Sequence, residues 1–178
     1  SFANRGIFRP PSYIQNISGG GSSVAVSEAA CFMINDMLSK VNRPDFPLNW
    51  QATERMPRIA WKTGTSYGKR DGWSIGYNRN YTVGVWTGNF SGIGVPDLSG
   101  SQTATPLLFR IFNTIDYDSD EFWFKQPQDC ELRKVCSETG MVPAPHCTNI
   151  VTDYFIPLIS STRICDNIRE IMVSPDSS

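Results

Sequence analysis

A lysine, a glycine and three hydroxyl residues stand in unbroken order in the first half of the chain, as Lys62, Thr63, Gly64, Thr65 and Ser66. Their surroundings, "RIAWKTGTSYGKRDGW", predict a strand followed by a glycine-containing turn. Side chains alternate between the faces of a strand, so Lys62 and Gly64 share one face and Thr63 and Thr65 share the other. A glycine in a strand often marks a place where another backbone comes close. This pattern is typical of a sheet edge to which an extended peptide adds, with the cation and hydroxyls binding its carboxylate or carbonyl groups.

The alternative interpretation is an exposed hairpin with a solvated lysine, and the five residues alone do not decide between the two. Two further strands follow, separated by the short turn "NRN". Three strands joined by short turns predict an antiparallel meander. They are expected at about Arg58 to Ser66, in "GWSIGYN" with Trp73, Ile75 and Tyr77 on one face, and in "YTVGVWTG" with Tyr81, Val83 and Val85 on one face. Trp61, Trp73 and Trp86 are expected to be packing residues.

Two helices are predicted to flank this meander. Ser27 is placed to cap the first, whose apolar residues fall on one helical face. Thr105 is expected to cap the second, with Pro106 starting it, and its apolar stripe should pack on the meander. The sequence therefore predicts an α+β fold, an antiparallel β-meander flanked by helices. The two apolar sets are Ala30, Met33, Ile34, Met37, Leu38 and Val41, and Leu107, Leu108, Ile111, Phe112 and Ile115.

Composition limits the class of protein. The chain has 178 residues, 40% of them hydrophobic, which is enough for one good core, alone or with a small appendage. The formal net charge is −1 and no basic stripe is present, so neither nucleic acid nor a membrane surface is indicated as a partner. No apolar run approaches the roughly 18 residues of a membrane span. The chain lacks an initiator Met and a signal-peptide pattern, and we expect it to be a piece of a longer protein.

Four of the five cysteines lie in the last third of the chain, which predicts an oxidising compartment and a disulfide-stapled tail. Four cysteines allow three pairings, and the sequence does not choose among them. Zinc is the competing interpretation because His146 precedes Cys147, but no C-x-x-C is present, and no metal site is predicted. Cys31, in the first helix, is expected to be a buried, inert thiol. We place the boundary near residue 120, giving segments 1–120 and 121–178, the second small and irregular. The four cysteines are Cys130, Cys136, Cys147 and Cys165.

"KTGTS" matches the third motif of serine penicillin-binding proteins and class A β-lactamases. The likeness extends through "IAWKTGTSYGKRDGWSIGYNRNYTVGVWTGNFSG", "NRPDFPLNW", "ATPLLFRIF" and the tail "VCSETGMVPAPHC". These stretches, in this order, resemble the transpeptidase domain of bifunctional penicillin-binding proteins and the segment that follows it. The resemblance implies part of the serine β-lactamase/transpeptidase-like fold in a cell-wall synthase whose parent also carries a glycosyltransferase domain. It further implies a membrane anchor upstream and a location at the periplasmic face of the bacterial inner membrane.

The resemblance also implies roles for the five residues. Lys62 would help to organise proton transfer and anchor the substrate carboxylate. Thr65 would bind that carboxylate through its hydroxyl and supply one oxyanion-hole N–H. Thr63, Gly64 and Ser66 are expected to contact the substrate. The reaction would be acyl transfer from a peptidoglycan stem peptide through a seryl ester, with β-lactams as mimics of the donor and no metal or cofactor.

The chain departs from the family pattern at its other two motifs. It contains no S-x-N, and its one S-x-x-K is "SYGK", Ser66 to Lys69, which follows the third motif instead of preceding it. Gly68 also makes a helical turn there unfavourable. We therefore expect this chain to lack the nucleophile, to be inactive alone, and to self-associate through an exposed apolar face near Cys31 and Met37. The alternative function is a non-catalytic binding or docking module of a cell-wall synthase, with its function in the tail.

Overall fold

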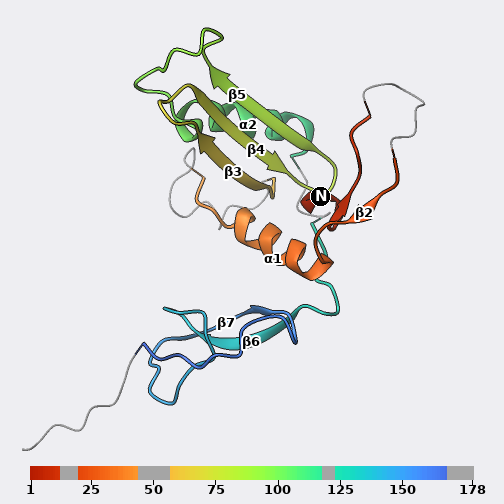
Figure 1. The fold of residues 1–178 in the computed structure, drawn as a ribbon, viewed down its shortest axis with the longest axis vertical. Helices are drawn as coiled ribbons and strands as arrows, with labels where there is room; N and C mark the ends of the chain where they lie inside the picture. The colour runs from red at the N-terminus through yellow and green to blue at the C-terminus, as the bar shows by residue number, and fades with distance from the viewer. Residues whose placement is uncertain (13–19, 44–56, 118–122, 168–178) are drawn as a thin grey trace, which may run out of the picture. The chain divides into compact units, whose positions relative to one another are not determined.

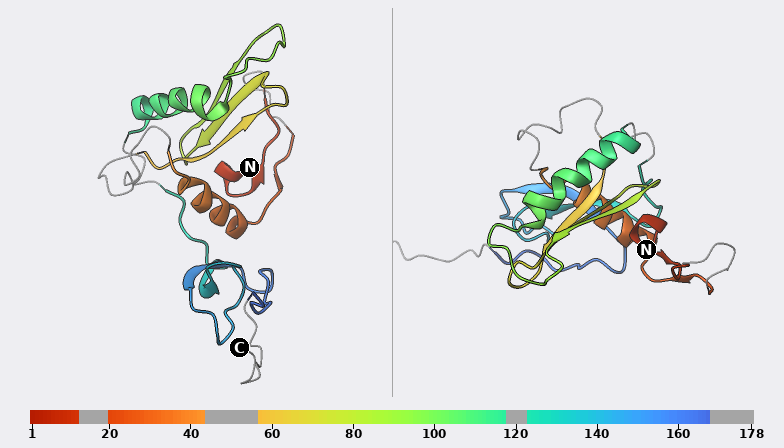
Figure 2. Two further views of the ribbon diagram at one scale, coloured as in Figure 1. Left: turned by 90° about the vertical axis from the view of Figure 1, so that its left-hand side faces the viewer. Right: turned by 90° about the horizontal axis from the view of Figure 1, so that it is seen from above.

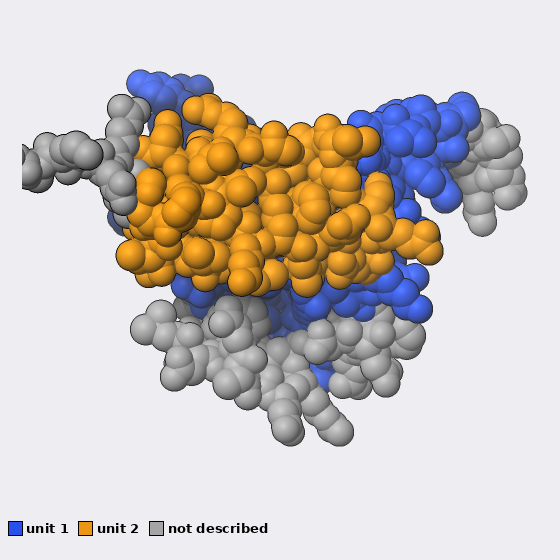
Figure 3. Space-filling model, turned by 90° about the horizontal axis from the view of Figure 1, so that it is seen from below, with its two compact units in different colours: residues 1–125 blue, residues 126–178 orange. Residues whose placement is uncertain are grey.

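The computed structural model describes residues 1–12, 20–43, 57–117 and 123–167. The chain divides into two compact units, residues 1–125 and 126–178 (Figure 3). The expected boundary near residue 120 falls in a stretch outside the described residues, as does most of "NRPDFPLNW". No helix in the described ranges has the length and hydropathy needed to cross a membrane.

Unit 1 is built on a three-stranded antiparallel sheet in the order β3-β4-β5, which confirms the predicted meander (Figure 1). The strands are β3 (Ala60–Thr65), β4 (Asp71–Tyr77) and β5 (Thr82–Gly88). A separate two-stranded sheet pairs β1 (Ile7–Phe8) with β2 (Ser23–Val24), and a 3-10 turn, η1 (Phe2–Asn4), precedes it. In the main sheet β3 has one described neighbour, so it is an edge strand among the described residues.

Helix α2 (Thr105–Ile115) packs across one face of this sheet, as predicted (Figure 2). Trp61 of β3 meets Phe109 of α2 edge to face, with ring centroids 5.1 Å apart. Such a contact adds about 0.5–1.5 kcal/mol to the burial of both rings. The face of β3 that carries Trp61 is therefore fixed against α2, and the opposite face, which carries Lys62, points away from it. The core consists of Ile59, Trp61, Val85, Ala104, Leu108, Phe109 and Phe112.

The start of α2 differs from the prediction. A π-helical turn, η3 (Gly100–Ala104), runs into the helix, and Ala104 holds the N-cap position without a side-chain cap. Thr105 is fully buried instead, and its hydroxyl bonds Ser74 Oγ at 3.1 Å and the Gly100 carbonyl at 3.0 Å. Thr105 therefore fastens the helix to β4. Of the predicted apolar stripe, Leu108 and Phe112 are buried, whereas Leu107, Ile111 and Ile115 are exposed.

Helix α1 (Glu28–Ser39) begins as predicted, because Ser27 Oγ accepts a hydrogen bond from the Ala30 N–H at 3.3 Å. The predicted apolar face is not the buried one, however, and Met37 remains 55% exposed. Polar contacts made by the opposite face explain the difference. Asn35 Oδ1 accepts the Tyr77 hydroxyl at 2.7 Å, and Asp36 pairs with Arg58 at 3.2 Å. The buried residues are Ala29, Cys31, Phe32, Asn35, Asp36 and Ser39.

The buried phenol of Tyr77 makes the stability of unit 1 sensitive to alkali. Desolvation raises the pKa of Tyr77 from its ordinary value of 10 to about 12. The folded state therefore holds this proton more tightly than the unfolded state. Its contribution is fully present below pH 10 and is lost as the pH rises through about 12. We expect Tyr77→Phe to reduce the loss of stability between pH 9 and 11, measured by urea unfolding. Tyr81→Phe, at an exposed site, is the control; equal losses in both variants would contradict this prediction.

Unit 2 contains a two-stranded antiparallel sheet, β6 (Glu131–Cys136) paired with β7 (Ile150–Phe155), which the sequence analysis did not predict. Arg133 of β6 lies over the Phe155 ring of β7, with its guanidinium carbon 5.0 Å from the centroid. The described buried apolar residues of this unit are few. They are Cys130, Val135, Cys136, Ala144, Ile156 and Cys165.

Candidate functional site

The candidate site is the exposed face and open edge of β3. The register pairs Lys62 with Ile75 and Gly64 with Trp73 of β4. These four residues lie on the face of the sheet opposite α2, since Trp61 faces the helix. The predicted alternation of the five-residue stretch is therefore present, with a cation and a glycine side by side on an exposed surface.

The backbone of β3 presents its free groups at the same edge. The Ser66 N–H donates to the Asp71 carbonyl at 2.9 Å, which makes this a hydrogen-bonded pair of the ladder. Antiparallel ladders alternate bonded and non-bonded pairs, so the N–H and C=O groups of Thr65 and Thr63 point away from β4. Among the described residues no strand pairs with this side. The edge can therefore receive the backbone of an extended peptide.

Lys62 lies directly beside these backbone groups. Its side chain is exposed, and its Nζ donates to the Thr63 carbonyl at 2.8 Å. Within the described part of the chain no carboxylate pairs with it. A lysine whose cation is held at a strand edge without a counter-ion offers a binding point for an anion.

Gly64 is not required by the fold. A Cβ built on it would meet nothing within 4 Å, and its φ is not in the left-handed region. Glycine in a strand costs about 0.5–1 kcal/mol relative to alanine, so a glycine without a structural reason needs another explanation. A glycine in a strand often marks a close approach of another backbone, and this face is open to one.

Thr65 and Ser66 are positioned differently from each other. The Thr65 hydroxyl oxygen accepts the Gly100 N–H at 3.1 Å, which leaves its own proton free to donate. The Ser66 hydroxyl accepts the N–H groups of Arg70 at 3.2 Å and Asp71 at 2.8 Å, and so closes the turn after β3. A substrate contact by Ser66 stays a prediction.

The S-x-x-K sequence from Ser66 to Lys69 forms a turn. Gly68 and Lys69 both have positive φ, of 74° and 53°. The N–H of Lys69 donates to the Ser66 carbonyl at 3.0 Å, and its ammonium contacts the Pro96 carbonyl. Ser66 and Lys69 therefore do not form the one-turn helical pair of a nucleophile and its base, in agreement with the sequence analysis.

Trp73 is not the core residue that was predicted. It is 45% exposed, and its neighbour Ile75 is 46% exposed, on the same face as Lys62 and Gly64. The reason is the sheet register, which turns the alternate residues Ser74 and Gly76 toward α2 and leaves these two outside. Trp61 is buried as predicted, and Trp86 is half-buried, with its Nε1 donating to Asp71 at 2.9 Å. An exposed apolar pair, Trp73 and Ile75, therefore adjoins the lysine.

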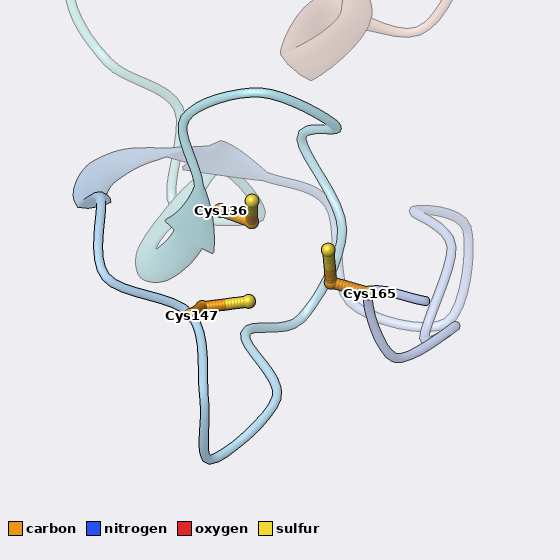
Figure 4. A group of neighbouring side chains, drawn as sticks. All are labelled: Cys136, Cys147 and Cys165. Atoms are coloured by element: carbon orange, nitrogen blue, oxygen red, sulfur yellow. The ribbon is translucent and has the colours of Figure 1, made fainter. Parts of the chain in front are cut away.

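A second group of reactive side chains lies in unit 2. The structure brings the sulfurs of Cys136, Cys147 and Cys165 within 4.8 Å of one another, from three separate segments (Figure 4). Backbone N–H groups of Glu138 and Thr139, together with the Thr139 hydroxyl, lower the pKa of Cys136 to about 7. Cys31, Cys136, Cys147 and Cys165 are free thiols in the structure, so the pairing of the expected disulfides stays open. Cys31 is buried as predicted, and desolvation raises the pKa of its thiol.

Comparison with known proteins identifies several relatives of this chain. No protein-family model matches. A 69-residue stretch, 39% of this chain, is 46% identical to penicillin-binding protein 1C of Escherichia coli. The match to penicillin-binding protein 1A/1B of Bacillus subtilis is 30% identical and covers 81% of this chain, and the match to penicillin-binding protein 1A of Clostridium perfringens is 26% identical over 67%. The chain spans only 9%, 18% and 15% of the lengths of these relatives.

The fold has a counterpart among solved structures. The crystal structure of penicillin-binding protein 1A from Haemophilus influenzae superposes on 79% of this chain with a TM-score of 0.63 at 22% identity. The superposition covers 22% of that protein. It confirms an α+β fold with antiparallel sheets of the kind found in that structure. The chain therefore has homologues named penicillin-binding proteins 1C, 1A/1B and 1A, as the sequence resemblance indicated.

Proposed function

We propose that this chain is part of a penicillin-binding protein of type 1C, a bifunctional peptidoglycan synthase. In this proposal residues 1–120 are the C-terminal part of its D,D-transpeptidase domain, and 121–178 are the cysteine-containing segment that follows. The observation that carries it is the edge of β3. Lys62 and Gly64 lie on its exposed face, and the backbone groups of Thr63 and Thr65 point to its open side.

This edge suits an acyl-transfer substrate. A stem peptide ending in D-Ala-D-Ala has an extended backbone, a terminal carboxylate and a scissile carbonyl. The Lys62 ammonium, which reaches the open edge at the Thr63 carbonyl, and the Thr65 hydroxyl, from the other face of the strand, would bind the carboxylate. The outward N–H of Thr65 would donate to the carbonyl oxygen as negative charge develops on it, a contact worth about 3 kcal/mol in the transition state. A serine outside these 178 residues would attack that carbonyl, the terminal D-Ala would leave, and an amine of a second stem peptide would then displace the serine.

The exposed surface beside Lys62 supports a site that this chain forms together with the rest of the transpeptidase domain. Trp73 and Ile75 form an exposed apolar pair on the same face of the sheet as Lys62 and Gly64. In this proposal the remainder of the transpeptidase domain, carrying the S-x-x-K and S-x-N motifs, covers them. The isolated chain would self-associate through its exposed apolar residues, which include Met37 of α1. The parent would be held at the periplasmic face of the inner membrane by an upstream anchor and would bind peptidoglycan stem peptides and β-lactams.

The alternative function, a docking module, is favoured by a different observation. Residues 126–178 form a compact unit with a sheet of their own. If the function lay there, substitutions in β3 would leave it intact and substitutions in the tail would abolish it. The two proposals therefore predict different effects of a Lys62 substitution on function.

The test is covalent labelling by a penicillin, followed by intact mass. This chain is compared with a longer protein extended upstream through the whole domain. We expect the longer protein to gain one drug mass and this chain to gain none, because it has the binding edge without the nucleophile. Labelling of this chain at a serine would contradict the proposed inactivity. Labelling of neither protein would contradict the transpeptidase assignment.

A further inference from the structure

We propose that Cys136, Cys147 and Cys165 form a binding site for a thiophilic divalent cation, with Zn²⁺ as the expected ion. The inference concerns unit 2 alone and does not depend on the function proposed for β3. It rests on the convergence of three sulfurs, on the backbone that holds them, and on the small core of the unit.

The first observation is the geometry of the sulfurs. All three lie within 4.8 Å of one another, and their side chains project into a common space (Figure 4). Zinc binds thiolate sulfur at about 2.3 Å with tetrahedral geometry, which places neighbouring sulfurs about 3.8 Å apart. Shifts of about 1 Å or less therefore bring these side chains to the ligand positions. A disulfide would use two of the three sulfurs and leave the third thiol beside the bond.

The second observation is the way the backbone fixes the cysteines. The Cys136 N–H donates to the Met141 carbonyl at 2.9 Å, and the Gly140 N–H returns to the Cys136 carbonyl at 2.8 Å. The Cys165 N–H donates to the Val142 carbonyl at 2.8 Å, where the chain forms a parallel bridge to Ile164. Three segments distant in sequence are thus tied around one point.

A backbone donor also faces the Cys147 sulfur, although burial raises the pKa of this thiol. The Ala144 N–H donates to the Cys147 sulfur at 3.3 Å, and the Cys147 N–H donates back to the Ala144 carbonyl at 3.0 Å. A backbone N–H directed at sulfur stabilises the thiolate that a metal requires. Orientation of the ligands by such outer contacts is typical of metal sites.

The three cysteines line a small cavity of about 10 Å³, which is roughly the space of one water molecule. Its lining offers oxygen atoms from Glu138, Thr148, Asn149 and Asn167. The Asn167 amide donates to the Glu138 carboxylate at the rim. A solvent molecule or the Glu138 carboxylate can complete a tetrahedral shell there. Binding of Zn²⁺ would release the protons of the three thiols, so affinity increases with pH.

The third observation is how little else stabilises unit 2. Apart from cysteines, its described buried apolar residues are Val135, Ala144 and Ile156. Domains of this size, about 50 residues, usually need a metal or disulfides because their core is too small. The three cysteines occupy the centre that a larger domain would fill with apolar side chains.

Metal titration of the full 178-residue chain, purified reduced and metal-free, tests the proposal. We expect one Zn²⁺ per chain by native mass spectrometry, with an increase in the thermal stability of unit 2. Co²⁺ should give a thiolate-to-metal charge-transfer band and the intense visible bands of a tetrahedral site. Cys147→Ser should lose stoichiometric binding. Cys147→His should keep it, because imidazole is also a zinc ligand.

The matched control is Cys31→Ser, which removes a thiol of unit 1 and should leave the metal stoichiometry at one. Cys147 is half-buried, so its variants are the least disruptive of the three. Absence of metal binding by the reduced chain would overturn the proposal. So would equal binding by the wild type and Cys147→Ser, or air oxidation to a disulfide among the three that added Zn²⁺ does not prevent.

Discussion

Replacing Lys62 with alanine in the longer protein, which carries the upstream nucleophile, is expected to slow β-lactam acylation by at least about a hundredfold. Lys62 is exposed on the edge strand, and within the described chain its contact is the Thr63 carbonyl, 2.8 Å away. The substitution therefore removes a cation without emptying a core or breaking an ion pair that holds the fold. Its effect should appear in the second-order rate constant for acylation, measured with a fluorescent penicillin.

Lys69→Ala is the matched control, because it removes a second exposed lysine only seven positions further along. Lys69 belongs to the turn after β3, where its ammonium contacts the Pro96 carbonyl. We expect acylation in this variant to stay within about twofold of the wild type, since surface changes of this kind seldom exceed 0.5 kcal/mol. Near-normal acylation in Lys62→Ala would support the docking-module alternative. A large loss in Lys69→Ala would show that the turn, and not β3, carries the chemistry.

Local sequence patterns predicted the parts of the fold that depend on neighbouring residues. The three strands form the predicted meander, and both the cap at Ser27 and the position of Pro106 in the first turn of α2 are observed. Each of these is decided within a few residues by alternation, capping or a fixed φ. The face of β3 on which Lys62 lies followed from the same alternation.

Tertiary contacts decided what the patterns did not predict. The buried face of α1 is set by Asn35 and Asp36, whose partners Tyr77 and Arg58 lie far along the chain. Thr105 has the sequence signature of a cap but bonds Ser74 in another element. The meeting of Cys136, Cys147 and Cys165 depends on a hairpin and a bridge for which unit 2 has no clear periodic signal. A C-x-x-C would have been a sequence signal for such a cluster, and the chain contains none.

Gly100→Ala is expected to destabilise unit 1 by about 3 kcal/mol. The Cβ of an alanine at this position would lie 2.5 Å from the Trp73 carbonyl oxygen and 2.6 Å from that of Gly64. Both atoms belong to the backbone of the sheet, so neither can move away as a flexible side chain would. The π-helical turn must separate from β3 and β4, which also lengthens the 3.1 Å bond from the Gly100 N–H to Thr65. Urea unfolding of this chain measures the loss.

If β3 is a substrate edge, we expect Gly64→Ala to leave the stability of this chain intact but to impair acylation in the longer protein. Its Cβ meets nothing within 4 Å, so we expect this chain to keep its stability or gain about 0.5 kcal/mol. In the longer protein the same methyl group occupies the face over which the peptide backbone must pass, and acylation should fall at least tenfold. Gly21→Ala, with open space around it, should change neither property. Normal acylation in Gly64→Ala would contradict close approach of the substrate, because it would show that the added methyl group does not obstruct the peptide.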